Sequence, residues 1–318
     1  MRVALLCEEA AGLRTLQLLA RSRHEIAAVL TSSGSPAWLL AEKLGISPLP
    51  ADRVRAPGFA EGLARRRVEL LLNVHSLYIV PEAVLRAPPE GAYNLHPGPL
   101  PQYAGLNAPS WAIYHGEASH GVTLHRMEPG IDTGPIVFQT RFPLSPEDTG
   151  LTVALRCAQE GLRLIERLLA VDVAALPLEP QDLGARRYFG RGVPQGGRID
   201  WNVDARRVHA FVRACNYRPF ASPWGAPMAE VDGQAVQVLK SALTGTPANA
   251  AAGTVHFDPG GRVRVACADE WLELVRTQPE LYPPPKSRLG TQSTTSGRNT
   301  STSVTPQTAT RNGTDSRV

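Results

Sequence analysis

Features of membrane, metal-binding and disulfide-linked proteins are scarce in this sequence. None of the apolar runs in its 318 residues approaches the roughly 20 residues that a bilayer-spanning helix needs. The four cysteines stand far apart and form no C-x-x-C pair: Cys7, Cys157, Cys215 and Cys267. We therefore expect no zinc site and no disulfide framework, and we expect a cytoplasmic protein whose thiols stay reduced.

Several signatures of cofactor binding and catalysis are also missing. The sequence has no G-x-x-x-x-G-K-[ST] phosphate loop, no G-x-G-x-x-G fingerprint after its first apolar run and no G-x-S-x-G nucleophile elbow. It has no H-x-x-x-H or H-E-x-x-H pair, and no partner spacing is evident at His75, His115, His120 and His125. These absences argue against the two familiar nucleotide-binding loops and against a metal site.

The net charge is concentrated at one end of the chain. Residues 283–318 hold five basic residues and one acidic residue, so their charge equals the +4 of the whole chain. The preceding 282 residues have 28 groups of each sign. Proteins that bind nucleic acid usually place their positive charge on the fold itself, so this balance argues against nucleic acid as the main partner.

Strands and helices alternate along the first half of the chain. Short apolar runs typical of strands occur at residues 2–7, 25–33, 68–74, 91–96 and 121–127, with stretches of helical periodicity between most of them. A long amphipathic helix follows, with Asp148 or Thr149 as its N-cap. This alternation predicts an α/β fold over residues 1–171, with a Rossmann-like, mostly parallel sheet and helices on both faces.

The pattern changes after this predicted catalytic domain. Residues 172–206 contain several glycines and prolines and predict a connector. From residue 207, a helical segment and short alternating segments separated by Asp-Gly and Pro-Gly-Gly turns predict a small β-barrel or meander over residues 207–282. Residues 283–318 are rich in serine, threonine and proline and have almost no apolar residues, so we expect a disordered tail.

The stretch NLHPGPLPQYAG, which starts at Asn94, follows one of the predicted strands. Residues i and i+2 of a strand project to one face, so Asn94 and His96 point the same way at a strand end, where open α/β sheets bind ligands. Histidine can accept a proton near neutral pH, and an asparagine amide can donate a hydrogen bond to an oxygen that becomes negative during a reaction. The prolines that follow, Pro97, Pro99 and Pro101, restrict the loop. The spacing alone fits a capped strand end with a structural histidine equally well.

A second candidate is Asp132 in MEPGIDTGPI, which lies between Gly130 and Gly134 on a turn between two predicted strands. A carboxylate in this position can pair with an imidazole, hold its tautomer and raise its pKa. Taken alone, an ordinary turn aspartate that caps neighbouring backbone groups is the simpler interpretation.

Taken together, NLHPGPLPQYAG and GVTLHRMEPGIDTGPI resemble the formyltransferases that use N10-formyltetrahydrofolate. That family has an Asn-x-His before a Leu-Pro loop, then G-V-T-x-H, then an Asp followed by x-Gly. The resemblance covers most of residues 1–170. It continues in RRYFGRGVPQGGRIDW and GTVHFDPGGRVRVACADEWLEL, which are similar to the connector and the OB-like C-terminal barrel of the longer members. Those members include methionyl-tRNA formyltransferases and amino-sugar N-formyltransferases.

The resemblance implies a role for each candidate residue. Asn94 would hydrogen-bond the formyl oxygen as it becomes an oxyanion, His96 would manage the proton of the attacking amine, and Asp132 would hold His96 and tune its pKa. A neutral amine attacks the N10 formyl carbon, a tetrahedral intermediate forms and tetrahydrofolate leaves. The folate would lie in an apolar cleft beside loop 73–80 and turn 128–132. Its expected contacts are Ser76, Tyr78, Ile79, Leu100, Glu128, Gly130 and Ile131, and no metal is expected.

The proline loop departs from the family at Ala104 and Leu106, where tRNA-acting and sugar-acting relatives often have arginine. Arginines of the connector can supply positive charge for a nucleotide-linked acceptor instead: Arg186, Arg187 and Arg198. We predict transfer to a small or carrier-tethered amine, either a nucleotide-linked amino sugar or an aminoacyl carrier protein, for which the tail would serve as an interdomain linker. A methionyl-tRNA formyltransferase is the main alternative, followed by a formyltetrahydrofolate hydrolase and a non-catalytic folate binder.

Overall fold

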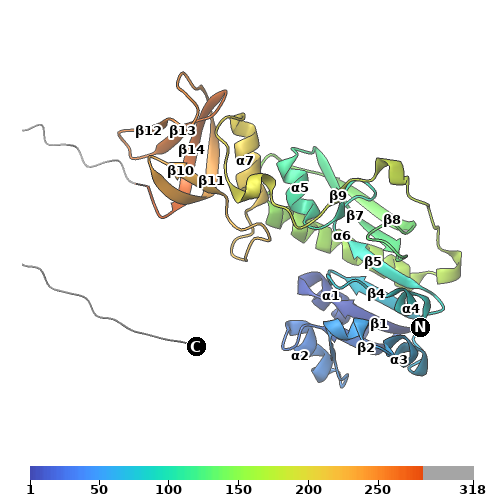
Figure 1. Ribbon diagram of the computed structural model, residues 1–318. Coiled ribbons are helices and arrows are strands. Elements are labelled where there is room, and N and C mark those ends of the chain that lie inside the picture. Colours follow the sequence, from blue (N-terminus) through green and yellow to red (C-terminus); the bar gives the residue numbers. More distant parts are fainter. Residues whose placement is uncertain (282–318) are drawn as a thin grey trace, which may run out of the picture. The chain divides into compact units, whose positions relative to one another are not determined.

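A seven-stranded sheet organises the first half of the chain (Figure 1). The computed structural model describes residues 1–281, so the predicted tail at 283–318 lies outside the described residues. The strand order is β3-β2-β1-β4-β5-β7-β8, with parallel pairing from β3 to β5 and antiparallel pairing from β5 to β8. The strands are β1 (Arg2–Cys7), β2 (Glu25–Thr31), β3 (Leu49–Pro50), β4 (Leu70–Val74), β5 (Ala92–His96), β7 (Ser119–Arg126) and β8 (Ile136–Pro143). The prediction of a Rossmann-like, mostly parallel sheet is confirmed.

The side chains of this sheet divide between two cores because successive strand residues face opposite sides. In β1, Val3 and Leu5 belong to one core, whereas Ala4 and Leu6 belong to the other. Helices α1, α2, α5 and α6 contribute to the first core, and α3 and α4 contribute to the second. The helices are α1 (Glu9–Ala20), α2 (Pro36–Lys43), α3 (Phe59–Arg65), α4 (Glu82–Arg86), α5 (Ala108–Tyr114) and α6 (Gly150–Ala170).

Helix α6 begins at a capping box and packs closely on β5. The Thr149 hydroxyl accepts from the Thr152 N–H, and the Thr152 hydroxyl accepts from the Thr149 N–H, so Thr149 is the N-cap. A Cβ atom at Gly161 would come within 2.6 Å of the Leu95 side chain, so glycine is what permits this close approach. Although α6 has 21 residues, no helix within residues 1–281 combines the length and apolar character of a membrane span.

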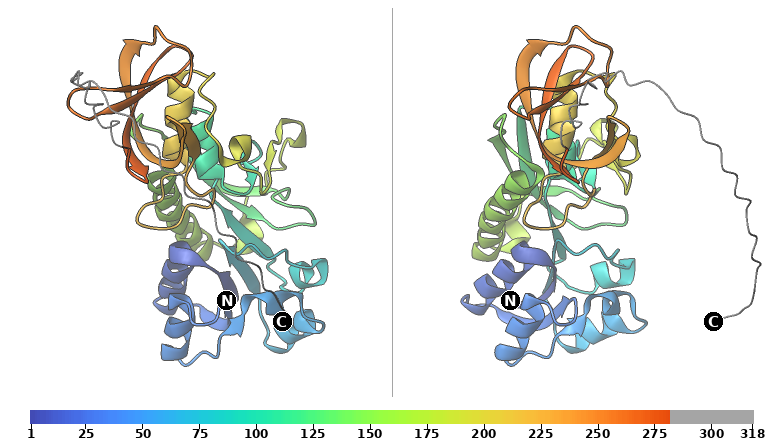
Figure 2. Two further views of the ribbon diagram at one scale, coloured as in Figure 1. Left: turned by 60° about the vertical axis from the view of Figure 1, so that its left-hand side comes forward. Right: turned by 90° about the vertical axis from the view of Figure 1, so that its left-hand side faces the viewer.

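A five-stranded antiparallel sheet forms the C-terminal part of the described chain, with order β10-β11-β14-β13-β12. Helix α7 (Ala205–Ala214) covers this sheet and also packs against α5, as Figure 2 shows. The strands are β10 (Met228–Val231), β11 (Gln234–Pro247), β12 (Val255–Phe257), β13 (Val263–Ala266) and β14 (Glu270–Gln278). The prediction of a small antiparallel β-domain after the parallel sheet is confirmed.

The connector crosses back to the proline loop, which the sequence did not predict. Its short strand β9 (Tyr188–Phe189) pairs in parallel with β6 (Ala104–Gly105), immediately after the proline-rich stretch. A Cβ atom at Gly105 would come within 2.2 Å of the Phe189 carbonyl oxygen, and its φ of 95° also favours glycine. The two backbones therefore approach each other more closely than a larger residue would allow.

Candidate active site

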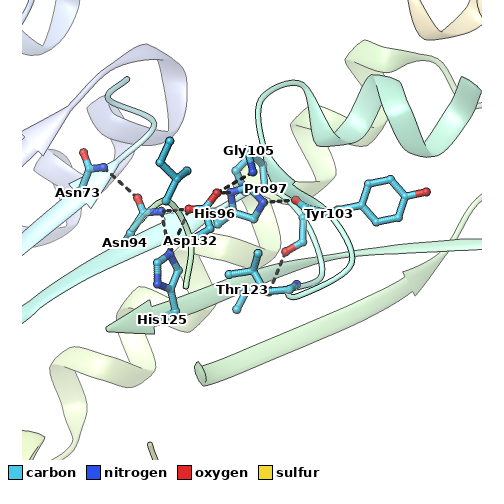
Figure 3. A network of polar contacts seen from close by, with 12 residues as sticks. Asn73, Asn94, His96, Pro97, Tyr103, Gly105, Thr123, His125 and Asp132 are labelled. Atoms are coloured by element: carbon cyan, nitrogen blue, oxygen red, sulfur yellow. Dashed lines mark hydrogen bonds and ion pairs between the residues drawn. The ribbon is translucent and has the colours of Figure 1, made fainter. Parts of the chain in front are cut away.

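Three polar side chains form a row across the carboxyl end of the sheet. The register pairs Asn73 of β4 with Asn94 of β5, and Asn94 with His125 of β7. Partners in adjacent strands lie side by side, so the three side chains reach each other. Asn73 Nδ2 lies 3.0 Å from Asn94 Oδ1, and Asn94 Nδ2 lies 3.0 Å from His125 Nε2 (Figure 3).

The hydrogen bonds in this row have one consistent direction. His125 Nδ1 lies 2.9 Å from the carbonyl oxygen of Arg126, which can only accept, so Nδ1 carries the proton. The Nε2 lone pair of His125 then accepts from the Asn94 amide, which leaves Asn94 Oδ1 to accept from Asn73. This order fixes the amide orientation of Asn94.

Asp132 joins the row from the turn after β7. Its φ of 54° is left-handed, and its side chain is buried. One carboxylate oxygen accepts from the Gly105 N–H at 2.8 Å and faces His96 Nδ1 at 3.4 Å, while the other lies 3.4 Å from both His125 Nε2 and Asn94 Nδ2. Burial acts to raise the pKa of Asp132, but His96 and the Gly105 N–H hold it well below its usual range.

The connector also supports the turn that carries Asp132. Gln181 Nε2 donates to the carbonyl oxygens of Asp132 and Gly134, at 3.0 and 2.6 Å. Arg186 donates to the carbonyl oxygen of Ile131 at 2.9 Å. The left-handed Asp132 is therefore held by residues about 50 positions further along the chain.

His96 is buried, and both of its ring nitrogens have partners. Nε2 lies 2.5 Å from the Tyr103 carbonyl oxygen and therefore carries a proton, while Nδ1 faces Asp132. Burial lowers the pKa of His96, and this effect outweighs Asp132 and the Tyr103 carbonyl, which act to raise it. The sequence suggested that Asp132 raises this pKa; it does act in that sense, but burial is the larger effect. The Tyr103 carbonyl thus occupies Nε2 of His96.

Side chains of β7 and β8 hold the loop between His96 and Tyr103. The Thr123 hydroxyl donates to Gly98 O at 2.7 Å and accepts from the Leu100 N–H at 3.1 Å. Gln139 Nε2 donates to Leu100 O at 2.9 Å, and His120 Nε2 donates to Pro97 O at 3.0 Å. The prolines restrict the loop, and these hydrogen bonds place it.

The expected folate contacts lie on the loops around this row, with different exposures. Ile79 and Ile131 are 66% and 43% exposed, and the neighbouring Leu77 is 77% exposed, so apolar surface is available there. Ser76 Oγ is buried with no hydrogen-bond partner among residues 1–281. Leu100 is buried and its backbone groups are bonded to Thr123 and Gln139, so it has the least freedom to contact a ligand. Glu128 and Gly130 are exposed, and Tyr78 is half-buried with the Arg55 guanidinium 4.9 Å from its ring centre.

Sequence reasoning missed His125, Asn73, Tyr103 and Gly105 as members of this network. His125 had a usable signal, because Thr123 and His125 alternate on a predicted strand that follows the Asn-x-His segment. The roles of Tyr103 and Gly105 had no such signal, because both act through the backbone.

The family and the fold agree with this geometry. Residues 15–169 match the formyl transferase family, and residues 193–285 match the formyl transferase C-terminal domain. The N-formyltransferase from Helicobacter canadensis, in complex with folinic acid and dTDP-3-aminofucose, superposes with a TM-score of 0.66 at 16% identity, over 86% of this chain and 98% of that one.

Two further structures have the same fold. WlaRD, a sugar 3N-formyl transferase with dTDP and 5-N-formyl-THF, has a TM-score of 0.66 at 16% identity, over 88% of this chain and 99% of that one. HypX from Aquifex aeolicus, with tetrahydrofolic acid, has a TM-score of 0.57 at 19% identity, over 87% of this chain and 44% of that one. Since the two family matches together span most of the chain, this protein belongs to the formyltransferase family.

Proposed function

We propose that this enzyme transfers the formyl group of N10-formyltetrahydrofolate to a primary amine, and that its acceptor is a nucleotide-linked amino sugar. The observation that carries the proposal is the convergence of Asn94, His96 and Asp132 at the carboxyl end of β5 in a chain of the formyltransferase family. Relatives with this fold bind folates together with dTDP or a dTDP-linked amino sugar, which supports both substrates.

The residues around the row suit a folate. Leu77, Ile79 and Ile131 offer exposed apolar side chains to its ring, and the unpartnered Ser76 hydroxyl is a candidate for its polar edge. N10-formyltetrahydrofolate supplies the formyl carbon that the acceptor amine attacks. The remaining roles belong to side chains of this protein.

Asn94 has one amide hydrogen available for the formyl oxygen. Its bond to His125 is 3.0 Å long, whereas its contact with Asp132 is 3.4 Å and weak. The hydrogen that faces Asp132 can therefore be donated to the formyl oxygen, which becomes negative during transfer. His125 acts as a positioning residue, because it fixes which end of the Asn94 amide points that way.

His96 moves the proton, and Asp132 stabilises the charge that results. When the Tyr103 carbonyl withdraws and the ring carries its proton on Nδ1, facing Asp132, Nε2 has a lone pair that can accept the proton of the attacking amine. Asp132 stays ionised because its pKa is held low, so it stabilises the imidazolium and keeps the ring oriented. Burial destabilises the charged form of the ring, which favours passing the proton on to N10 of the departing tetrahydrofolate.

The connector supplies the positive charge that the loop lacks at Ala104 and Leu106. Pairing of β9 with β6 brings Arg187 to within 5.2 Å of the Tyr103 ring centre. One or two such arginines suit the phosphates of a nucleotide sugar, whereas tRNA needs a broader basic surface, and residues 1–282 are neutral overall. An aminoacyl carrier protein is the second candidate acceptor. The four cysteines are free, in keeping with action in the cytoplasm.

Formyl transfer measured by product mass tests this proposal, with dTDP-linked amino sugars, aminoacyl carrier protein and methionyl-initiator tRNA assayed in parallel. Product on tRNA alone would contradict the acceptor assignment, and formate release without any acceptor would indicate a hydrolase.

Asn94→Ala and His96→Ala should each lower kcat by roughly 100-fold or more. The exposed His256 of β12 gives a matched control, so His256→Ala should leave kcat unchanged. Tetrahydrofolate binding without any turnover in the wild type would indicate a non-catalytic binder.

A further inference from the structure

Glu9 and His75 form a hydrogen-bonded pair at the carboxyl ends of β1 and β4, and the roles above do not use it. From β1, the chain adds β2 and β3 on one side of the sheet and then β4 and β5 on the other side. The strand order therefore reverses between β1 and β4, and open α/β sheets bind ligands at the carboxyl ends of the strands beside such a point. Glu9 comes two residues after β1 and His75 one residue after β4.

The backbone of both residues is unusual. Glu9 has a φ of 57° and His75 a φ of 60°, in the left-handed region that residues other than glycine rarely adopt. Such a conformation is strained and persists only where the surroundings enforce it, which is common at binding sites. The fold thus holds both residues in strained positions that bring their side chains together.

The contact between them leaves the Glu9 carboxylate available to a ligand. His75 Nδ1 lies 3.0 Å from Glu9 Oε2, and this hydrogen bond lowers the pKa of Glu9, so Nδ1 carries the proton and the carboxylate is ionised. The Glu9 side chain is 74% exposed, whereas that of His75 is 12% exposed. Within residues 1–281, the Glu9 carboxylate has His75 as its side-chain partner, and no arginine or lysine there competes for it.

Two acceptor atoms near the carboxyl end of β4 have no hydrogen-bond donor among residues 1–281. His75 Nε2 has a lone pair and no partner among the described residues. Asn73 donates through Nδ2 to both Ser76 O and Asn94, and its Oδ1 also has no partner there. Buried polar groups are nearly always hydrogen-bonded, so a ligand with O–H or N–H donors would complete the hydrogen bonding of Asn73 and His75.

The pair lies beside the reactive residues. Val74 pairs with Leu95 across β4 and β5, so His75 follows at the level of His96, about one strand spacing away. Burial is the main cause of the lowered pKa of His96, and His75 acts in the same direction, so the two rings interact. A ligand group bound at Glu9 is therefore a near neighbour of the reacting amine.

We infer that Glu9, oriented by His75, binds ring hydroxyl groups of the acceptor's amino sugar next to the amine that is formylated. This inference rests on the proposed function and narrows its acceptor class. Hydrogen bonds from hydroxyl groups to a carboxylate are short and strong, and the unpartnered acceptors at Asn73 and His75 suit the same donors. The carboxylates of Glu8 and Glu9 repel phosphate, so the nucleotide's phosphates bind elsewhere. An aminoacyl carrier offers no ring hydroxyl for this subsite.

Steady-state kinetics with two acceptors test the inference. The probes are dTDP-3-aminofucose, whose amine is flanked by ring hydroxyls, and its analogue lacking one of those hydroxyls. In the wild type, loss of the contacted hydroxyl should raise the acceptor KM roughly 10- to 100-fold. In Glu9→Gln, the KM for the full sugar should rise by a similar factor and the difference between the two sugars should vanish, with the KM for the folate unchanged.

Two variants separate this role from a structural one. His75→Asn keeps a residue that tolerates positive φ but removes the ring, so it should weaken the preference for the hydroxylated sugar without abolishing turnover. Glu25 pairs with Arg2 at the amino ends of β1 and β2, at the other end of these strands, and Glu25→Gln should change neither KM. An unchanged preference in Glu9→Gln refutes the subsite while leaving formyl transfer to sugars intact. Product only on carrier protein or tRNA refutes the proposed acceptor and the subsite together.

Discussion

Replacing Thr123 with valine tests whether hydrogen bonds, beyond the prolines, hold the loop that follows His96. The Thr123 side chain is fully buried and bonds to the Gly98 carbonyl and the Leu100 N–H. Valine has nearly the same shape without the hydroxyl, so both backbone groups lose a partner where water does not reach. At about 1–3 kcal/mol for each unsatisfied buried group, the free energy of unfolding should fall by about 2–6 kcal/mol.

Urea unfolding followed by tryptophan fluorescence measures this change, and kcat measures its effect on the site. We expect kcat to fall by roughly tenfold or more, because the loop also carries the Tyr103 carbonyl that contacts His96. Thr140 on the adjacent β8 is a matched control: it is half-buried, and its hydroxyl makes no hydrogen bond within residues 1–281. If Thr123→Val and Thr140→Val change the free energy of unfolding equally, hydrogen bonding by Thr123 does not hold the loop.

Two further predictions concern the same loop. Gly98→Ala would place a Cβ atom 2.8 Å from both His96 Nε2 and Tyr103 O. The added methyl group should push these two atoms apart and lower both kcat and Tm. If kcat and Tm were both unchanged, the packing around Gly98 would not be this close. His120 is buried, and burial lowers its pKa to about 4. The unfolded chain therefore binds a proton at His120 more readily than the folded protein does. Its contribution to stability is complete above pH 6.5 and is lost as the pH falls towards 4, by about 3 kcal/mol. His120→Gln should show a correspondingly smaller loss of unfolding free energy between pH 7 and pH 4 in urea titrations, and an unchanged loss would exclude His120 as its source.

The sequence determined the parts of this protein that depend on local patterns. Alternating apolar runs and helical periodicity predicted the mostly parallel sheet and the small antiparallel domain, because those patterns follow from which faces of each element are buried. The Asn-x-His spacing placed Asn94 and His96 on one side of a strand end, since strand residues alternate with a period of two. The motif resemblance then identified the formyltransferase family, which the family matches confirm.

Only the tertiary structure decided how these residues are connected. His125 faces Asn94 because β7 pairs with β5 in an antiparallel register, and register between strands is not encoded by the spacing within either one. The Tyr103 carbonyl on His96 and the Gly105 N–H on Asp132 are backbone groups, which every residue has and no motif reveals. Glu9 and His75 are 66 residues apart in the chain, and they pair only because β1 and β4 are neighbours in the sheet. Side-chain types and local periodicity can thus be identified from the sequence. Contacts made by strand pairing and by the backbone arise only when distant segments pack together.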